Sequence, residues 1–267
     1  MKAIIFDCDG VLVDSEAIYQ EAEVRFLTEL GLRIDPKAYA KKFMGLSPDV
    51  YYRTLFETYT PELSGGFPED FEKKLSSYCK QQIEENLRAV PGALPYITSL
   101  TVPFAVASST NLEFLHKKLR MTSMHTHFDP HIYSGEQVAR GKPFPDLFLF
   151  AANRLGVAPA NCVVFEDSVN GVTAGLAAGM RVVGFCGGGH CDASHADVLL
   201  QAGAHAIAYS YDDPILWRLP VQRPFGALRH STKGRIGCCS CEASVLTIRR
   251  DQEQITDVPP KRCQLSC

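Results

Sequence analysis

Two aspartates stand one residue apart directly after the first apolar stretch of the chain. Asp7 and Asp9 follow residues 3–6, whose composition is typical of a buried strand, and Gly10 comes next. Open α/β sheets bind ligands at the carboxyl ends of their strands. Two neighbouring carboxylates repel each other unless they share a cation, and Mg²⁺ prefers oxygen ligands. The pattern predicts a nucleophile, Asp7, and a proton-transferring acid/base, Asp9, although Asp and Gly are also common at ordinary turns.

A hydroxyl-rich turn follows a second apolar stretch, residues 102–107. The Ser108 hydroxyl and the neighbouring amides could donate hydrogen bonds to a phosphoryl oxygen. We place Ser108, Ser109 and Asn111 among the candidate substrate-binding residues. A plain Ser-Ser-Thr turn without a ligand is the structural alternative.

A lysine and an acidic pair complete the set of candidate residues. Lys142 stands between Gly141 and Pro143, where the restrained chain can hold its ammonium group as a point charge. Glu166 and Asp167 end the apolar residues 162–165. We predict that Asp167 completes a metal site and that Glu166 assists through water or an indirect contact, while a helix N-cap is the alternative for one of them.

The elements that must position these residues form a repeating pattern. Short apolar stretches at 3–6, 102–107, 162–165 and 181–185 are separated by segments of helix length. This alternation predicts an α/β fold with a doubly wound, Rossmann-like parallel sheet as its core. We attribute the glycines of the segment after 162–165, including Gly171 and Gly175, to close helix–sheet packing.

Residues 15–86 interrupt this pattern with amphipathic helices. We predict three parts: a core of residues 1–14 and 87–220, an inserted α-helical cap of residues 15–86, and a tail of residues 221–267. The tail carries 8 Lys and Arg against 4 Asp and Glu, a charge of +4, and holds five of the ten cysteines. Its composition predicts a poorly ordered extension.

Charge and hydropathy narrow the class of partner. The net charge of −3 gives no reason to expect nucleic acid or an anionic membrane as partner, and no apolar run of membrane-spanning length or signal peptide stands out. The scattered cysteines of the core fit a reducing compartment. We expect a cytoplasmic protein that binds a small phosphorylated metabolite, and nothing implies a protein partner.

Taken together, the four groups of polar residues at successive strand ends resemble the haloacid dehalogenase-like phosphohydrolases. The family pattern is Asp-x-Asp, then Ser or Thr, then Lys, then acidic residues, and the resemblance covers roughly residues 1–215. It implies that Asp7 is the nucleophile, that Asp9 is the acid/base, and that Ser108 and Lys142 orient the phosphoryl group. It also implies a Mg²⁺ cofactor bound by Asp7, the Asp9 backbone carbonyl and Asp167, with Glu166 beside it.

The position of the insertion resembles the helical-cap subgroup of that family. Asp14, Ser15 and Glu16 lead into the cap, and Glu16 is a candidate substrate-binding residue. Cap closure would exclude water while a phosphoaspartate forms. The segment 101–184 is similar to bacterial sugar-phosphate phosphatases, including those of the 6-phosphogluconate type.

Alternatives within and outside the family stay open. A β-phosphoglucomutase-type mutase has the same architecture, but Tyr19 stands where the resemblance implies a histidine, and Pro48 follows Gly45-Leu46-Ser47 where it implies an arginine. Phosphonate cleavage would need a cap lysine, and dehalogenation would not need Asp9. A catalytically idle binding module is the alternative of another class. Phosphatase is the favoured interpretation, because every side chain of the pattern is present.

The loop 187–192 holds a histidine and a cysteine after three glycines, and His195 follows it. Their spacing matches no common zinc pattern, so we predict a mobile loop there.

Overall fold

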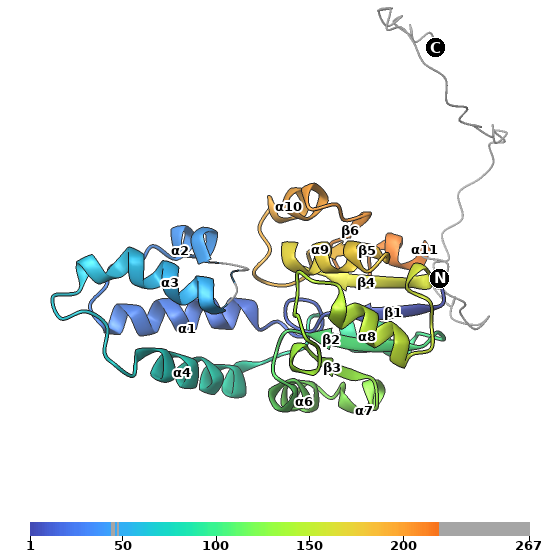
Figure 1. Ribbon diagram of the computed structural model, residues 1–267, viewed down its shortest axis with the longest axis horizontal. Coiled ribbons are helices and arrows are strands. Elements are labelled where there is room, and N and C mark those ends of the chain that lie inside the picture. Colours follow the sequence, from blue (N-terminus) through green and yellow to red (C-terminus); the bar gives the residue numbers. More distant parts are fainter. Residues whose placement is uncertain (44–45, 47, 219–267) are drawn as a thin grey trace, which may run out of the picture. The chain divides into compact units, whose positions relative to one another are not determined.

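Six parallel strands form the sheet that positions the candidate residues. The computed structural model describes residues 1–43, 46 and 48–218. The strand order is β3-β2-β1-β4-β5-β6, and the five neighbouring pairs are all parallel. Figure 1 labels the strands, whose bounds are β1 Ala3–Phe6, β2 Phe104–Ser108, β3 Ile132–Ser134, β4 Cys162–Glu166, β5 Arg181–Phe185 and β6 Ala206–Ala208.

Helices cover both faces of this sheet, because side chains of a buried strand alternate between them. Ile4 and Phe6 of β1 lie in one apolar cluster, while Ala3 and Ile5 lie in another. The core helices are α5 Ala93–Thr98, α6 Leu112–Met121, α7 His125–Phe128, α8 Asp146–Arg154, α9 Val169–Ala177, α10 His195–Gln201 and α11 Pro214–Arg218. The prediction of a doubly wound α/β fold is confirmed.

Four of the helices that the chain forms between β1 and β2 have an apolar cluster of their own. They are α1 Glu16–Glu29, α2 Pro36–Phe43, α3 Pro48–Tyr59 and α4 Phe71–Asn86, with a short 3₁₀ helix at Thr60–Glu62. Leu27 of α1, Tyr39 of α2 and Leu55 of α3 are almost fully buried in this cluster. The cap boundaries at 15 and 86 stay a prediction. Gly45, Ser47 and the tail 221–267 lie outside the described residues.

The two connections between these helices and the sheet run side by side. Gly10 turns the chain after β1 with a φ of +72°, a conformation that glycine adopts without strain. The Asp14 amide donates to the Arg88 carbonyl at 2.9 Å, and the Val90 amide donates to the Leu12 carbonyl at 2.9 Å. This pairing fixes Ser15 and the start of α1 next to the carboxyl end of β1. Within the described residues, we find no helix that is long and apolar enough to span a membrane.

Candidate active site

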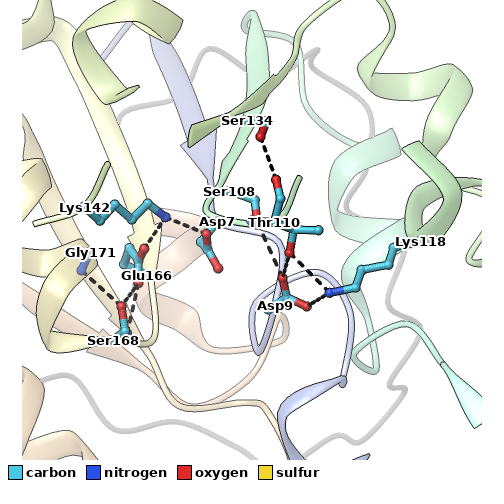
Figure 2. Close-up of polar contacts among 10 residues, drawn as sticks. All are labelled: Asp7, Asp9, Ser108, Thr110, Lys118, Ser134, Lys142, Glu166, Ser168 and Gly171. Atoms are coloured by element: carbon cyan, nitrogen blue, oxygen red, sulfur yellow. Dashed lines mark hydrogen bonds and ion pairs between the residues drawn. The ribbon is translucent and has the colours of Figure 1, made fainter. Parts of the chain in front are cut away.

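Lys142 bridges two carboxylates at the carboxyl ends of β1 and β4. Its ammonium nitrogen lies 2.5 Å from Asp7 Oδ1 and 2.6 Å from Glu166 Oε1. Figure 2 marks both contacts with dashed lines. All three side chains are at least 90% buried. Burial raises the pKa of Asp7, and the Lys142 ammonium opposes that rise. The lysine therefore stabilises the ionised form of Asp7, which is the form that can act as a nucleophile.

Glu166 is held in place by the start of α9. Its second oxygen, Oε2, accepts hydrogen bonds from the Ser168 amide and hydroxyl, both at 2.9 Å. A Cβ atom on Gly171 would lie 1.8 Å from the Glu166 carboxyl group, so this glycine makes room for the carboxylate. Gly175 instead packs on the sheet as predicted, since a Cβ there would lie 2.7 Å from Val182. Both oxygens of Glu166 thus have protein partners, which favours a role in positioning Lys142.

Asp9 faces a different set of partners, on the side of β2 and α6. Lys118 and the Ser15 hydroxyl both contact Asp9 Oδ1. The Thr110 hydroxyl donates to Oδ2 at 2.7 Å, and Figure 2 shows this bond and the Lys118 contact. The Ser108 hydroxyl is 3.5 Å from the same Oδ2. Although burial opposes it, the Lys118 ammonium holds the pKa of Asp9 below its usual value. Asp9 is therefore an ionised carboxylate in this arrangement.

Lys118 is a site residue that the sequence analysis missed. Its side chain is 1% exposed, and its ammonium also lies 5.2 Å from the Tyr19 ring and 5.1 Å from the Phe114 ring. A signal was present, because Lys118 falls on the apolar face of α6 together with Phe114 and Leu115. A charged residue on the buried face of a helix needs a partner, and here the partner is Asp9.

The remaining candidates of the β2 turn differ in their surroundings. Ser108 is buried at the end of the strand, where its Oγ accepts a hydrogen bond from the Thr110 amide at 3.1 Å. The Asn111 side chain accepts from the Phe114 amide at 2.9 Å and so caps α6. Ser109 is exposed. Ser108 is thus the residue of this turn's three candidates with a side-chain contact to the predicted acid/base among the described residues.

Asp167 is held by two histidines that the sequence analysis did not assign to the site. His190 Nε2 donates to Asp167 Oδ2 at 3.0 Å, and His195 Nε2 donates to the Asp167 backbone carbonyl at 2.6 Å. A Cβ atom on Gly10 would lie 1.8 Å from Asp167 Oδ2. The turn after β1, the end of β4 and the loop after β5 therefore meet at Asp167.

The carboxylates of the site fit a hard divalent cation. Asp7, Glu166 and Asp167 each offer an oxygen within 4.8 Å of the others, and all three are buried. Burial first, and then neighbouring carboxylates, raise the pKa values of Asp7 and Asp167 well above their usual range. A cation at this position would remove that repulsion, and oxygen donors are the ligands that Mg²⁺ prefers.

Glu16, the predicted cap-side residue, lies between the carboxylates and a pocket. Burial, Asp9 and Asp167 together raise its pKa to about 7. The pocket has a volume of about 330 Å³ and is lined by residues of α1 to α4 and Leu46. Its α1 side presents Glu16, Tyr19, Gln20 and Glu23. A compartment with polar side chains on its α1 side thus adjoins the candidate catalytic residues.

Comparisons with known proteins agree with this geometry. A sequence model described as haloacid dehalogenase-like hydrolase matches residues 1–179. The 6-phosphogluconate phosphatase of Escherichia coli K12 is 32% identical over 195 residues, covering 71% of this chain and 85% of the relative. The phosphorylated carbohydrates phosphatase of Thermotoga maritima is 34% identical over 211 residues, covering 78% and 94%.

Solved structures are similar over the same part of the chain. A HAD family hydrolase from Deinococcus radiodurans, with bound phosphate and sodium, has a TM-score of 0.68 and 36% identity, covering 79% of this chain and 92% of that one. A putative β-phosphoglucomutase from Thermotoga maritima has a TM-score of 0.63 and 33% identity, covering 78% and 94%. The family resemblance inferred from the four groups of polar residues is confirmed.

Proposed function

This chain belongs to the haloacid dehalogenase-like hydrolases and is a phosphoric monoester hydrolase, and from that premise we propose that it hydrolyses a small sugar phosphate with Mg²⁺ through a phosphoaspartate on Asp7. The observation that carries the proposal is the buried contact of Lys142 with both Asp7 and Glu166. It fixes the Lys142 ammonium group beside the carboxyl group of Asp7, at the carboxyl end of a central strand. Such a pair can bind a phosphoryl group and attack it.

The reaction divides into two displacements at phosphorus. An Asp7 oxygen forms a bond to phosphorus while the bond between phosphorus and the sugar oxygen breaks. The sugar oxygen receives a proton from Asp9. A water oxygen then forms a bond to phosphorus while the bond between phosphorus and the Asp7 oxygen breaks. One proton of the water passes to Asp9, and inorganic phosphate leaves. Lys142 and the Ser108 hydroxyl donate to the phosphoryl oxygens in both steps. Mg²⁺, which Asp7, Asp167 and the Asp9 carbonyl would hold, supplies positive charge against the transferred group.

The environment of Asp9 supports its proposed role as a proton acceptor. Its pKa is held low by Lys118, so the carboxylate is ready to accept a proton from water in the second displacement. Donation in the first displacement requires that Asp9 first gain a proton, which Lys118 disfavours. The proposal therefore assigns to Asp9 a change of protonation, and with it a change of partner, between the two steps.

The pocket beside Glu16 supports a substrate rich in hydroxyl groups. The Tyr39 hydroxyl lies 3.1 Å from Glu23 Oε2 and 2.7 Å from the Tyr51 hydroxyl. The buried Gln20 Nε2 has no hydrogen-bond partner among the described residues. Carboxylate, hydroxyl and amide groups around one cavity provide both acceptors and donors for a polyol. The names of the two phosphatase relatives point to the same class of substrate.

A direct test is phosphate release from a panel of hexose, pentose and hexitol phosphates, with 6-phosphogluconate included, in Mg²⁺ and after chelation. We expect Mg²⁺-dependent release that is lost in Asp7→Asn. Asp70→Asn, at an exposed residue of a surface ion pair, is the matched control and should retain activity. Release that continues unchanged in Asp7→Asn would refute the mechanism.

The same preparations should be assayed for isomerisation of β-glucose 1-phosphate, because mutase activity is the alternative. Isomerisation that outpaces phosphate release would favour the mutase. Binding of Mg²⁺ and a sugar phosphate without release would favour the idle module.

A further inference from the structure

A second group of metal-binding side chains lies on the loop after β5, apart from the carboxylates of the proposed reaction. His190, Cys191 and His195 each offer a donor atom, and these atoms lie within 4.8 Å of one another. A thiol and two imidazoles are softer ligands than the carboxylates of Asp7 and Asp167. Such a set suits Zn²⁺, Co²⁺ or Ni²⁺ and is poorly matched to Mg²⁺.

The hydrogen bonds of the two histidines leave the same ring nitrogen available. Both donate from Nε2 to Asp167, one to the carboxylate and the other to the backbone carbonyl. In each ring the other nitrogen, Nδ1, then carries a lone pair. Histidines that bind metals commonly donate their second nitrogen to a carboxylate or a backbone carbonyl, which fixes the ring. Asp167 therefore orients both imidazoles in the tautomer that a metal ion needs.

The Nδ1 lone pair of His190 accepts no hydrogen bond from the described residues. Its side chain is 2% exposed, and its buried Nδ1 has no hydrogen-bond partner among the described residues. A buried polar atom without a partner costs about 1–3 kcal/mol. A metal ion at this position would satisfy the atom without breaking the bond between His190 and Asp167.

The cluster is compact enough for one tetrahedral ion. Zinc binds sulfur at about 2.3 Å and nitrogen at about 2.0–2.1 Å, so ligand atoms around one ion lie about 3.3–3.8 Å apart. The Cys191 sulfur lies beside the His190 ring, 3.4 Å from the Nε2 atom that Asp167 holds, so binding at Nδ1 requires the thiol to move around the ring. The Cys186 sulfur, which is hydrogen-bonded to Cys191, is near enough to offer a fourth ligand.

The loop that carries the cluster is held by hydrogen bonds within the loop and to the segment after β1. The Gly189 amide donates to Asp14 at 2.8 Å, and the Cys191 amide donates to the Gly188 carbonyl at 3.1 Å. A Cβ on Gly188 would lie 2.8 Å from the Gly10 carbonyl oxygen and from the His190 ring, so only glycine allows this approach. The loop that we predicted to be mobile is thus anchored on the turn after β1.

We propose that His190, Cys191 and His195 form a binding site for a borderline divalent metal ion such as Zn²⁺, distinct from the oxygen site of Asp7 and Asp167. The ion is bound through His190 Nδ1, a ring nitrogen of His195 and the Cys191 thiolate, whose proton is released on binding. Because both histidines also hold Asp167, occupancy of this site restrains the carboxylate that the proposed Mg²⁺ site uses.

The test is a Co²⁺ titration of the full chain followed by absorbance, since cobalt bound to a thiolate gives a charge-transfer band. The five cysteines of the tail are changed to serine in every sample, which removes their contribution. We expect one Co²⁺ per chain with this band and its displacement by Zn²⁺. Cys191→Ser should weaken the band and lower the affinity, Cys186→Ser/Cys191→Ser should abolish the band, and His195→Ala should weaken binding about 100-fold or more.

Two matched controls separate this cluster from other thiols and histidines. Cys79→Ser changes a buried thiol of the cap helices, and His116→Ala changes a histidine that pairs with His125 at 2.8 Å. Both should titrate like the unaltered chain. The proposal is overturned if the unaltered chain shows no charge-transfer band, or if the band survives in Cys191→Ser with unchanged affinity.

Discussion

Replacing Lys118 by methionine tests the buried pair between this lysine and Asp9. The Lys118 side chain is 1% exposed and that of Asp9 is 15% exposed. Removing one partner of a buried ion pair typically costs about 3–5 kcal/mol, because the other charge is left uncompensated. Asp9 keeps its hydrogen bonds to Ser15 and Thr110, so we expect the free energy of unfolding at pH 7.5 to fall by about 2–4 kcal/mol.

The pH dependence of this loss follows from the sign of the pKa shift. With Lys118 present, the pKa of Asp9 is lowered, so the ionised carboxylate stabilises the fold above the unfolded pKa of about 3.9. Without the lysine, burial raises the pKa of Asp9, and ionisation then destabilises the fold. The variant should therefore lose less stability at pH 5 than at pH 7.5, where the buried carboxylate must carry its charge.

Urea denaturation at the two pH values measures both quantities, and Lys117→Met is the matched control. Lys117 is the neighbouring residue on α6, and its ion pair with Glu84 is exposed, with side-chain exposures of 48% and 42%. Such pairs contribute about 0–1 kcal/mol. In the double variant Asp9→Asn/Lys118→Met, we expect about 2 kcal/mol of the loss to be recovered. Equal losses for Lys117→Met and Lys118→Met, or a loss that does not change with pH, would refute the reasoning.

Two further predictions concern the support of the site and the pocket. Gly171→Ala should reduce phosphate release about tenfold or more, because the added Cβ would displace the Glu166 carboxylate that positions Lys142. Gly65→Ala is the control and should keep its activity, since a Cβ there meets no atom within 4 Å. Equal activities of the two variants would contradict this prediction. Burial raises the pKa of Glu23 from 4.5 to about 7, so its ionisation destabilises the fold as the pH rises through that window. Between pH 4.5 and 7.5, the free energy of unfolding of Glu23→Gln, measured in urea, should therefore rise by about 3 kcal/mol relative to that of the unaltered chain. A difference in unfolding free energy that does not change with pH would contradict the raised pKa.

The strands that the sequence predicted share a simple property. Residues 3–6 and 162–165 are unbroken apolar runs, and residues 181–185 are apolar after the exposed Arg181. Each forms a strand with bounds within one residue of the prediction. The stretch 102–107 became β2, Phe104–Ser108. In contrast, β3 and β6 are only three residues long and were missed. A segment of three residues is too short to show a hydrophobic period.

Only the site residues that are marked by their neighbours in the sequence could be predicted. Asp7 and Lys142 stand next to strand ends or prolines, so their positions could be inferred from neighbouring residues, and the structure brings them within 2.5 Å. Lys118 lies 109 positions from its partner Asp9, and no local feature encodes that contact. His190 follows three glycines, and only the fold shows that the glycine loop bends back onto the turn after β1.

The phosphorylated intermediate offers the most direct test of the central claim. A sugar phosphate with labelled phosphorus is mixed with the full chain and Mg²⁺, the reaction is quenched in acid during turnover, and the peptides are analysed by mass spectrometry. We predict an acid-stable, base-labile phosphoryl group on the peptide that contains Asp7, and none in Asp7→Asn. Steady turnover without any labelled peptide, or a label on a different residue, would contradict the account.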